Sequence, residues 1–332
     1  MPSKVRLFLG GDMMLGRGVN EMILRMGPAY PVQELAPVTR KADLFFVNLE
    51  CAITDKDLVY RGPPKAFYFR ASRKAIETLQ LAGVHLVNLA NNHALDADYE
   101  GLLDTLQHLD RAGIAHVGAG ENIEAARKPA LLQKKGLRIG VLGCCDHQED
   151  FAATEDRSGI YHVDPDNSEH MEGLITDIRA LREHVDVLVL SYHWMPNWVP
   201  HIPEQYRQTA TRLLQAGVDV LWGHSPHHFL GVAWLKHKVI LYSTGDLIDD
   251  YAIHPVYRND RQLLFACYLT PEGVADVEAL PLQLEYACTL PASGPVRRWI
   301  LERFARYCKE VGSRIEVHND WIRVIPEQED GA

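Results

Sequence analysis

Histidines, carboxylates and amides stand directly after six apolar runs of this sequence. The stretch GHSPHHF, residues 223–229, follows the apolar run VDVLW and supplies His224 and His227. The other five runs contribute Asp12, Asn48 with Glu50, Asn91 with Asn92 and His93, then His193, and finally Asp246. Taken singly, each of these residues is typical of a turn, a solvated strand end or a packed core. Six such strand ends together favour one common site.

Carboxylate oxygen, amide oxygen and neutral imidazole form the ligand set of divalent metals such as Mn, Fe or Zn. No cysteine stands at these positions, which argues against a structural zinc knot. Two nearby metals can hold a hydroxide and clamp the oxygens of an in-line displacement, which is hydrolytic chemistry most natural at phosphorus. If His224 and His227 are ligands, metal affinity should fall as the pH drops through roughly 6, because protonated imidazole binds no metal.

The same stretch nearly matches the nucleophile elbow of the α/β-hydrolases, with Ser225 central and with Asp249 and His254 following in the expected order. That mechanism uses the backbone N–H of the residue after the nucleophile to stabilise the oxyanion. This residue is Pro226, which has no N–H. A serine hydrolase is therefore excluded.

Strand and helix alternate over the first two-thirds of the chain, with amphipathic helices expected within residues 72–83, 98–113, 168–184 and 204–217. Open α/β sheets bind ligands beyond the carboxyl ends of their strands, where the polar residues stand. After Gly223 the strands leave no room for crossover helices, so we expect them to pair largely antiparallel. A (β/α)₈ barrel needs a helix after each strand, and the last third does not supply them. We predict an α/β fold of two packed mixed sheets flanked by helices, forming one domain over residues 1–332 with a C-terminal helix and closing strand at about 295–326.

Composition limits the function classes. The net charge of −10 and the lack of a basic patch argue against nucleic acid as a partner. The apolar runs are too short to span a bilayer and the N-terminus does not resemble a signal peptide, so we expect no membrane partner and a cytoplasmic location. The six cysteines show no paired spacing, which indicates free thiols. The sequence leaves the oligomeric state open.

The motifs GDMMLGR, NLECAIT, NLANNHALD, SYHW, GHSPH and STGDLIDDY, in this order and spacing, resemble the CapA-type poly-γ-glutamate (capsule) biosynthesis proteins of the calcineurin-like metallophosphoesterase superfamily. The resemblance implies a four-layer αββα sandwich around a dinuclear metal site. It makes Glu50 the bridging carboxylate and His93 the catalytic histidine. The remaining ligands that it implies are Asp12 and His227 for the first metal and Asn92, His193 and His224 for the second.

One departure from the superfamily pattern concerns Met14, which stands where most relatives have a histidine ligand. A thioether is a poor ligand for these metals, so the first site loses one ligand.

Two functional hypotheses follow. The first is a metal-dependent phosphoesterase that uses one or two Mn, Fe or Zn ions on a small anionic or phosphoester substrate. Arg17, Lys65 and Arg70 are then the candidates for holding the anionic group. The second is a non-catalytic or ligand-binding accessory protein of poly-γ-glutamate or capsule biosynthesis with a degenerate metal site. The Asn92–His93 pair favours the enzyme, and the missing histidine at position 14 favours the accessory protein.

Overall fold

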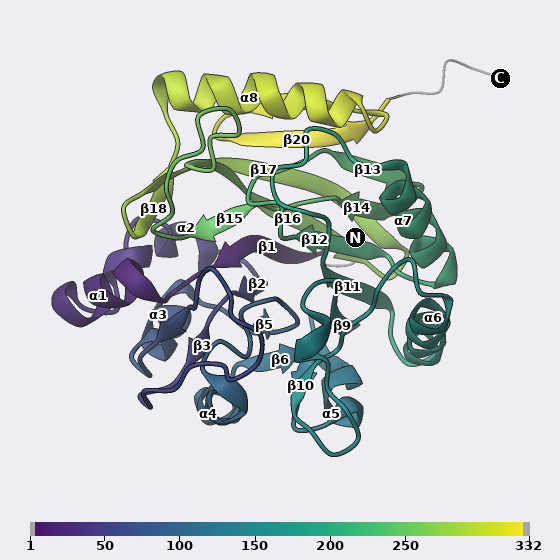
Figure 1. Cartoon of the computed structure of the whole chain (residues 1–332). Coiled ribbons are helices and arrows are strands. Elements are labelled where there is room, and N and C mark those ends of the chain that lie inside the picture. Colours follow the sequence, from purple (N-terminus) through teal and green to yellow (C-terminus); the bar gives the residue numbers. More distant parts are fainter. Residues whose placement is uncertain (1–3, 328–332) are drawn as a thin grey trace.

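Two β-sheets packed face to face form the centre of the molecule in the computed structural model, which describes residues 4–327 (Figure 1). The larger sheet has the strand order β19–β20–β17–β16–β1–β2–β5–β6, with β15 paired to β1 and β18 paired to β17. Its strands are β1 (Val5–Met13), β2 (Leu44–Leu49), β5 (Leu86–Asn88), β6 (Ala115–Val117), β15 (Asp246–Ile248), β16 (Arg261–Thr270), β17 (Gly273–Glu285), β18 (Cys288–Pro291), β19 (Ser313–His318) and β20 (Trp321–Pro326).

The smaller sheet has the order β13–β14–β12–β11–β9–β8. Its strands are β8 (Ala130–Lys134), β9 (Leu137–Cys145), β11 (Val187–His193), β12 (Val220–His224), β13 (Val232–Leu235) and β14 (Lys238–Leu241). Two short pairs stand apart, namely β3 (Ala52–Ile53) with β4 (Arg70–Ala71) and β7 (Ala119–Gly120) with β10 (Gly159–Ile160).

Helices cover the outer faces of both sheets. Figure 1 shows α1 (Arg17–Met26), α3 (Ala75–Ala82) and α4 (Asp98–Ala112) on the side of the larger sheet, and α6 (Ser168–Arg182) and α7 (Glu204–Ala216) on the side of the smaller one. The remaining helices are α2 (Ala36–Thr39), α5 (Ile123–Arg127), α8 (Gly294–Lys309) and the 3-10 turns η1 (Tyr30–Val32) and η2 (Glu149–Phe151). The predicted four-layer αββα arrangement of two mixed sheets is confirmed.

The alternation of side chains along β1 explains why two apolar cores form. Leu7 and Leu9 join the core that contains residues of both sheets, whereas Phe8 joins the second core under α1, α3 and α4. Neighbouring residues of a strand point to opposite faces, so one apolar strand can contribute to both cores. Trp222 of β12 ties the sheets together, because its indole Nε1 donates to the carbonyl oxygen of Gly10 at 3.0 Å.

The last third of the chain agrees with the sequence in most respects. Strands β16, β17 and β18 pair antiparallel as expected, and the predicted C-terminal helix is α8, followed by the hairpin β19–β20. Within this largely antiparallel region there are two parallel pairings, of β14 with β12 and of β15 with β1, although β14 also pairs antiparallel with β13. The chain enters β14 through the antiparallel hairpin with β13 and reaches β15 by crossing from the smaller to the larger sheet, so neither needs a crossover helix.

Two further observations bear on the sequence analysis. All six cysteines are free, and all but Cys288 are buried. Within residues 4–327, no helix is both long enough and apolar enough to cross a membrane.

Gly11 is where β1 and the turn before β15 approach most closely. A Cβ built at Gly11 would lie 1.8 Å from the carbonyl oxygen of Gly245, and that carbonyl accepts the N–H of Asp12 at 2.8 Å. We therefore expect Gly11→Ala to push β15 away from β1, with an overpacking cost of about 1–3 kcal/mol or more. Urea unfolding in the presence of a chelator measures this cost.

The matched control for that variant is Gly173→Ala in α6, where a Cβ would have no atom within 4 Å. Alanine is favoured over glycine within a helix by about 0.5–1 kcal/mol, so the control should unfold at the same or a higher urea concentration. Equal stability of the two variants would contradict the close approach of β1 and β15.

Candidate metal centre

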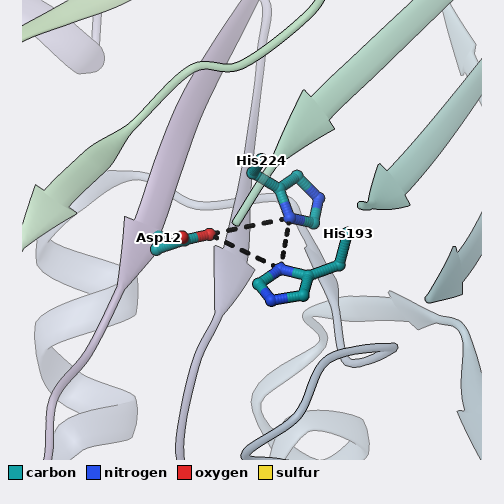
Figure 2. Close-up of side chains that lie close together, drawn as sticks. All are labelled: Asp12, His193 and His224. Atoms are coloured by element: carbon teal, nitrogen blue, oxygen red, sulfur yellow. Dashed lines mark hydrogen bonds and ion pairs between the residues drawn. The ribbon is translucent and has the colours of Figure 1, made fainter. Parts of the chain in front are cut away.

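The parallel register of the central strands brings the polar residues at their carboxyl ends to one place between the sheets. In the larger sheet Asp12 of β1 pairs with Asn48 of β2 on one side and with Asp246 of β15 on the other. In the smaller sheet His193 of β11 pairs with His224 of β12. Figure 2 shows that Asp12 points from its strand toward the rings of both histidines.

The first group of potential ligands, here called the histidine-rich cluster, consists of Asp12, His193 and His224. The Nδ1 atoms of the two histidines lie 2.8 Å apart, and Oδ1 of Asp12 lies 3.9 Å from Nδ1 of His193 and 3.6 Å from Nδ1 of His224. Ser191 Oγ lies 2.8 Å from the other ring nitrogen of His224, and this contact directs Nδ1 into the cluster. All three ligand candidates are buried.

The second group, here called the carboxylate-rich cluster, consists of Asp12, Glu50, His227 and Asp246. Nδ1 of His227 lies 2.9 Å from Oδ1 of Asp246 and 4.0 Å from Oδ2 of Asp12. Asp12 is therefore the carboxylate common to both clusters, whereas the family resemblance placed Glu50 between the two metals. A central position for Asp12 follows from β1 being the strand between β2 and β15.

Unpartnered carboxylate oxygens test whether these residues fit a metal. Asp12 Oδ2, Glu50 Oε1, Asp246 Oδ2 and Asp249 Oδ2 are all buried and have no hydrogen-bond partner. Buried polar atoms in proteins are rarely left without a partner, and an unpaired buried charge is strongly destabilising. Carboxylate oxygens together with neutral imidazoles are the donors that divalent transition metals prefer. The residues present therefore fit one or two divalent ions.

The pKa shifts of the carboxyl groups also agree with a cation-binding site. Burial raises the pKa of Asp12 to about 6, although His227 and the Asn48 donor lower it. Burial also raises the pKa of Glu50 well above its ordinary value, and the nearby Asp12 and Asp246 carboxylates raise it further. The pKa of Asp246 is raised by burial, by Asp249 and by Asp12. Protons therefore compete with a cation for these groups more strongly than for ordinary carboxylates.

The histidines of the centre are shifted in the opposite direction. Burial lowers the pKa of His224 to about 3 and lowers the pKa of His193 well below its ordinary value, with His224 as the next largest cause. The pKa of His227 is lowered by burial as well, although Asp12 and Asp249 oppose this shift. Neutral imidazole is the form that binds metal, so burial keeps these side chains ready as ligands.

Three buried asparagines form a hydrogen-bond network that ends at the carboxylate of Asp12. Asn48 Nδ2 donates to Oδ1 of Asp12 at 2.8 Å, and Oδ1 of Asn48 accepts from Asn88 at 2.8 Å and from Asn91 at 3.1 Å. Oδ1 of Asn91 in turn accepts the backbone N–H of His93 at 3.0 Å. This network fixes the amide orientation of Asn48 and connects the carboxylate of Asp12 to the loop that carries His93.

His93 lies beside the carboxylate-rich cluster. Its Nδ1 is 2.5 Å from Oδ2 of Asp96, and its Nε2 is 3.9 Å from Oε1 of Glu50. The ring of Phe69 stacks on the imidazole with centroids 3.8 Å apart. Burial lowers the pKa of His93 to about 4, while Asp96 raises it and Lys65 lowers it. One ring nitrogen is thus held by Asp96 and the other faces the proposed ligands.

The structure places the remaining predicted site residues as follows. Asn92 Oδ1 contacts Nε2 of His193 at 3.0 Å, which is the ring nitrogen that does not face Asp12. Lys65 is bonded to Asp96 at 2.5 Å and to the backbone oxygen of Asn92. Arg17 lies 3.4 Å from Asp250, with its side chain 38% exposed. Arg70 pairs with Asp57 at 2.9 Å, so its guanidinium is engaged by the loop that precedes it.

Asp96 was missed as a functional candidate in the sequence, and Asp246 was named as a strand-end residue of the common site but was given no ligand role. Asp246 stood among the strand-end residues, but the short strand that carries it gave no sign that it would pair with β1. Asp96 follows His93 by three residues in NHALD, and this spacing was the available signal. Met14, the unusual residue of the first motif, is buried, and its sulfur accepts the N–H of Gly16 at 3.1 Å.

Metal affinity should depend on pH mainly through the carboxyl groups. With the pKa of Asp12 at about 6 and those of Glu50 and Asp246 well above their ordinary values, protons compete with the ion throughout the acidic range. The affinity for Mn²⁺ should rise as the pH increases from 5 to 8, by about tenfold per unit for each proton displaced. Titration calorimetry in buffers of different ionisation enthalpy measures both the Mn²⁺ affinity and the number of protons displaced. Metal affinity that stays constant over this range would contradict the raised carboxyl pKa values.

Comparison with known proteins places this centre in a family. The family model described as bacterial capsule synthesis protein PGA_cap matches residues 6–251, a range that includes every ligand candidate named above. A probable polyglutamine synthesis accessory protein of Mycobacterium tuberculosis is 30% identical, and the match covers 98% of this chain and 97% of that protein. The PGA biosynthesis protein CapA of Bacillus subtilis is 28% identical over 85% of this chain and 72% of its own.

Among solved structures, a hypothetical protein from Thermus thermophilus superposes with a TM-score of 0.51 at 13% identity, covering 84% of this chain and 99% of that one. At this identity the likeness concerns the fold alone. The family match and the relative from Mycobacterium tuberculosis carry the assignment. The chain belongs to the bacterial capsule synthesis protein PGA_cap family, the group of CapA-like proteins.

Proposed function

We propose that this protein is a metal-dependent hydrolase that acts on a phosphoester. The observation that carries the proposal is the meeting of unpartnered carboxylate oxygens, neutral histidines and the His93–Asp96 pair at one point between the sheets. When bound, one or two divalent ions would supply Lewis-acid chemistry, by activating water and by neutralising charge on the substrate oxygens. Asp12, Glu50, Asp246, His193, His224 and His227 would hold them, with Asn92 adjoining His193.

His93 is the residue proposed to act on the substrate directly. Asp96 accepts from Nδ1 of His93 and fixes the ring, so Nε2 is the atom that would take up a proton, from water or the nucleophile, and pass it to the departing oxygen. Burial lowers the pKa of His93, Asp96 raises it, and Lys65 lowers it. We therefore assign Lys65 to positioning, because its ammonium neutralises the buried carboxylate of Asp96.

Aromatic side chains shelter the centre from bulk water. Tyr251 lies with its hydroxyl 3.4 Å from Oε2 of Glu50, and its ring meets those of Phe69 and His227 at centroid distances of 5.6 and 5.4 Å. The ring of Trp198 lies 5.4 Å from that of His227 on another side. Limited access of water strengthens the electrostatic interactions within such a site.

Arg17 remains the candidate for contact with an anionic group of the substrate. Its guanidinium lies 5.6 Å from the ring centroid of Phe67 and 5.7 Å from that of Phe69, the ring that stacks on His93. With 38% of its side chain exposed, it is accessible from solvent next to the proposed catalytic histidine. Arg70 is a weaker candidate, because its guanidinium is held by both Asp57 and the backbone oxygen of Lys56, whereas Arg17 has the longer contact with Asp250 at 3.4 Å.

The second candidate function is a non-catalytic accessory protein of polymer synthesis. The name of the relative from Mycobacterium tuberculosis favours it, as does methionine at position 14. The two proposals differ in what they require of His93. A binding protein needs the ligands but has no use for a general acid beside them.

His93→Asn tests the enzymatic proposal. This variant should retain metal and fold but lose about 10²–10⁴ in kcat, because a positioned acid contributes on that scale. KM should change much less, since the lost interaction belongs to the transition state. The assay is hydrolysis of p-nitrophenyl phosphate and bis(p-nitrophenyl) phosphate with added Mn²⁺ or Zn²⁺.

His201→Asn is the matched control, because its side chain is 74% exposed and its partner Glu310 lies outside the site. It should keep wild-type activity and metal content. Loss of metal from His93→Asn, or an unchanged kcat, would contradict the role given to His93. Metal-loaded wild type that hydrolyses neither ester class nor any other phosphoester would favour the accessory protein.

A further inference from the structure

The strand β15 reaches the metal centre by an unusual route. After β14 of the smaller sheet the chain crosses to the larger sheet and pairs parallel with β1, so that Asp246 lies directly opposite Asp12. The crossing depends on Gly245, which has φ +66° and whose carbonyl oxygen accepts from Asp12 N–H. The short strand thus brings to the centre a carboxylate that lies more than 200 residues from Asp12 in sequence.

The contacts of Asp246 are those of a ligand. Its Oδ1 lies 2.9 Å from Nδ1 of His227, its Oδ2 is buried without a partner, and its side chain has no exposed surface. The nearby cations do not neutralise it, because Lys65 is paired with Asp96 and Arg17 with Asp250. Within residues 4–327, Asp246 therefore forms no salt bridge with a lysine or arginine, and its basic contact is His227.

Position 14 explains why such a carboxylate is needed. Position 14 lies two residues after Asp12, just beyond the end of β1, and the family resemblance puts a histidine ligand at this position in most relatives. Met14 offers only a thioether, and its sulfur is already hydrogen-bonded to the N–H of Gly16. Without Asp246, the carboxylate-rich cluster would retain only Asp12, Glu50 and His227.

We propose that Asp246 replaces the missing histidine as the fourth protein ligand of the carboxylate-rich cluster, and that this exchange makes the two clusters select different ions. Three carboxylates and one imidazole form a mainly oxygen site, which suits Mn²⁺ or Mg²⁺. One carboxylate and two imidazoles form a mainly nitrogen site, which suits Zn²⁺. The proposal rests on the metal dependence of the proposed function, but not on phosphoester hydrolysis.

Metal binding by Asp246→Asn tests the proposal without any assay of activity. The change is isosteric and keeps an oxygen acceptor for His227, but it removes the negative charge. Mn²⁺ affinity should fall by at least about tenfold, the scale on which even residues around a ligand shell alter metal binding. Zn²⁺ binding at the histidine-rich cluster should change by less than about threefold. Equilibrium dialysis followed by elemental analysis measures both.

Two further variants make the result specific. His224→Asn should show the reverse pattern, with Zn²⁺ binding weakened more than Mn²⁺ binding. Asp276→Asn removes a carboxylate that pairs with Arg323 away from the centre, and it should change neither Mn²⁺ binding nor Zn²⁺ binding. In chelator, Asp246→Asn should unfold at a temperature no lower than wild type, because it relieves repulsion among buried carboxylates.

The wild-type protein provides a test that needs no variant. Given one equivalent each of Mn²⁺ and Zn²⁺, it should retain one ion of each kind after desalting. Unchanged Mn²⁺ affinity in Asp246→Asn, equal loss of both ions, or wild type that holds no Mn²⁺ would each overturn the proposal. Wild type that binds both ions but hydrolyses no phosphoester would overturn the proposed function and leave the role of Asp246 standing.

Discussion

Repulsion among buried carboxylates is the constraint on which the centre of this molecule depends. Asp12, Glu50, Asp246 and Asp249 are buried close together, and each has an oxygen without a hydrogen-bond partner. Fully ionised, they would place four negative charges in a region of low dielectric, where like charges repel strongly. Protons relieve this repulsion, as the raised carboxyl pKa values indicate, and two divalent ions would relieve it completely. The fold therefore holds together a group of carboxyl groups whose charge a bound proton or cation would balance.

The two-sheet architecture supplies the rigidity that this arrangement requires. β1 and β12 face each other across the inner core, and Trp222 joins them by its bond to Gly10. The carboxyl ends of both strands consequently reach the same level, with Asp12 on one and His224 on the other. Behind Asp12, the hydrogen bonds of Asn48 prevent the carboxylate from turning away from its neighbours. Each charged group is thus oriented by the sheet interior before any ion is present.

The sequence was sufficient for the fold class and for the strand ends that carry His193 and His224, because buried parallel strands with polar termini give a strong pattern. It placed Asp246 among the strand ends but gave it no ligand role, because β15 has only three residues and its partner is set by the packing of two sheets rather than by any local periodicity. The same limit applies to Lys65. Its loop has no periodic pattern, so its pairing with Asp96 followed only from the position of β4 beside β3.

The position of His93 bears on the choice between the two proposed functions more directly than the ligands do. Its Nε2 is 3.9 Å from a carboxylate of the cluster, yet its other nitrogen is held by Asp96 rather than by a group of the metal centre. Asp96 is itself buried and paired with Lys65, so two further side chains are committed to the orientation of one ring. Burying a charged pair costs free energy unless its geometry is well satisfied. This cost has no counterpart in a binding role, whereas in the proposed hydrolase it would hold an acid in a fixed orientation beside the ligands.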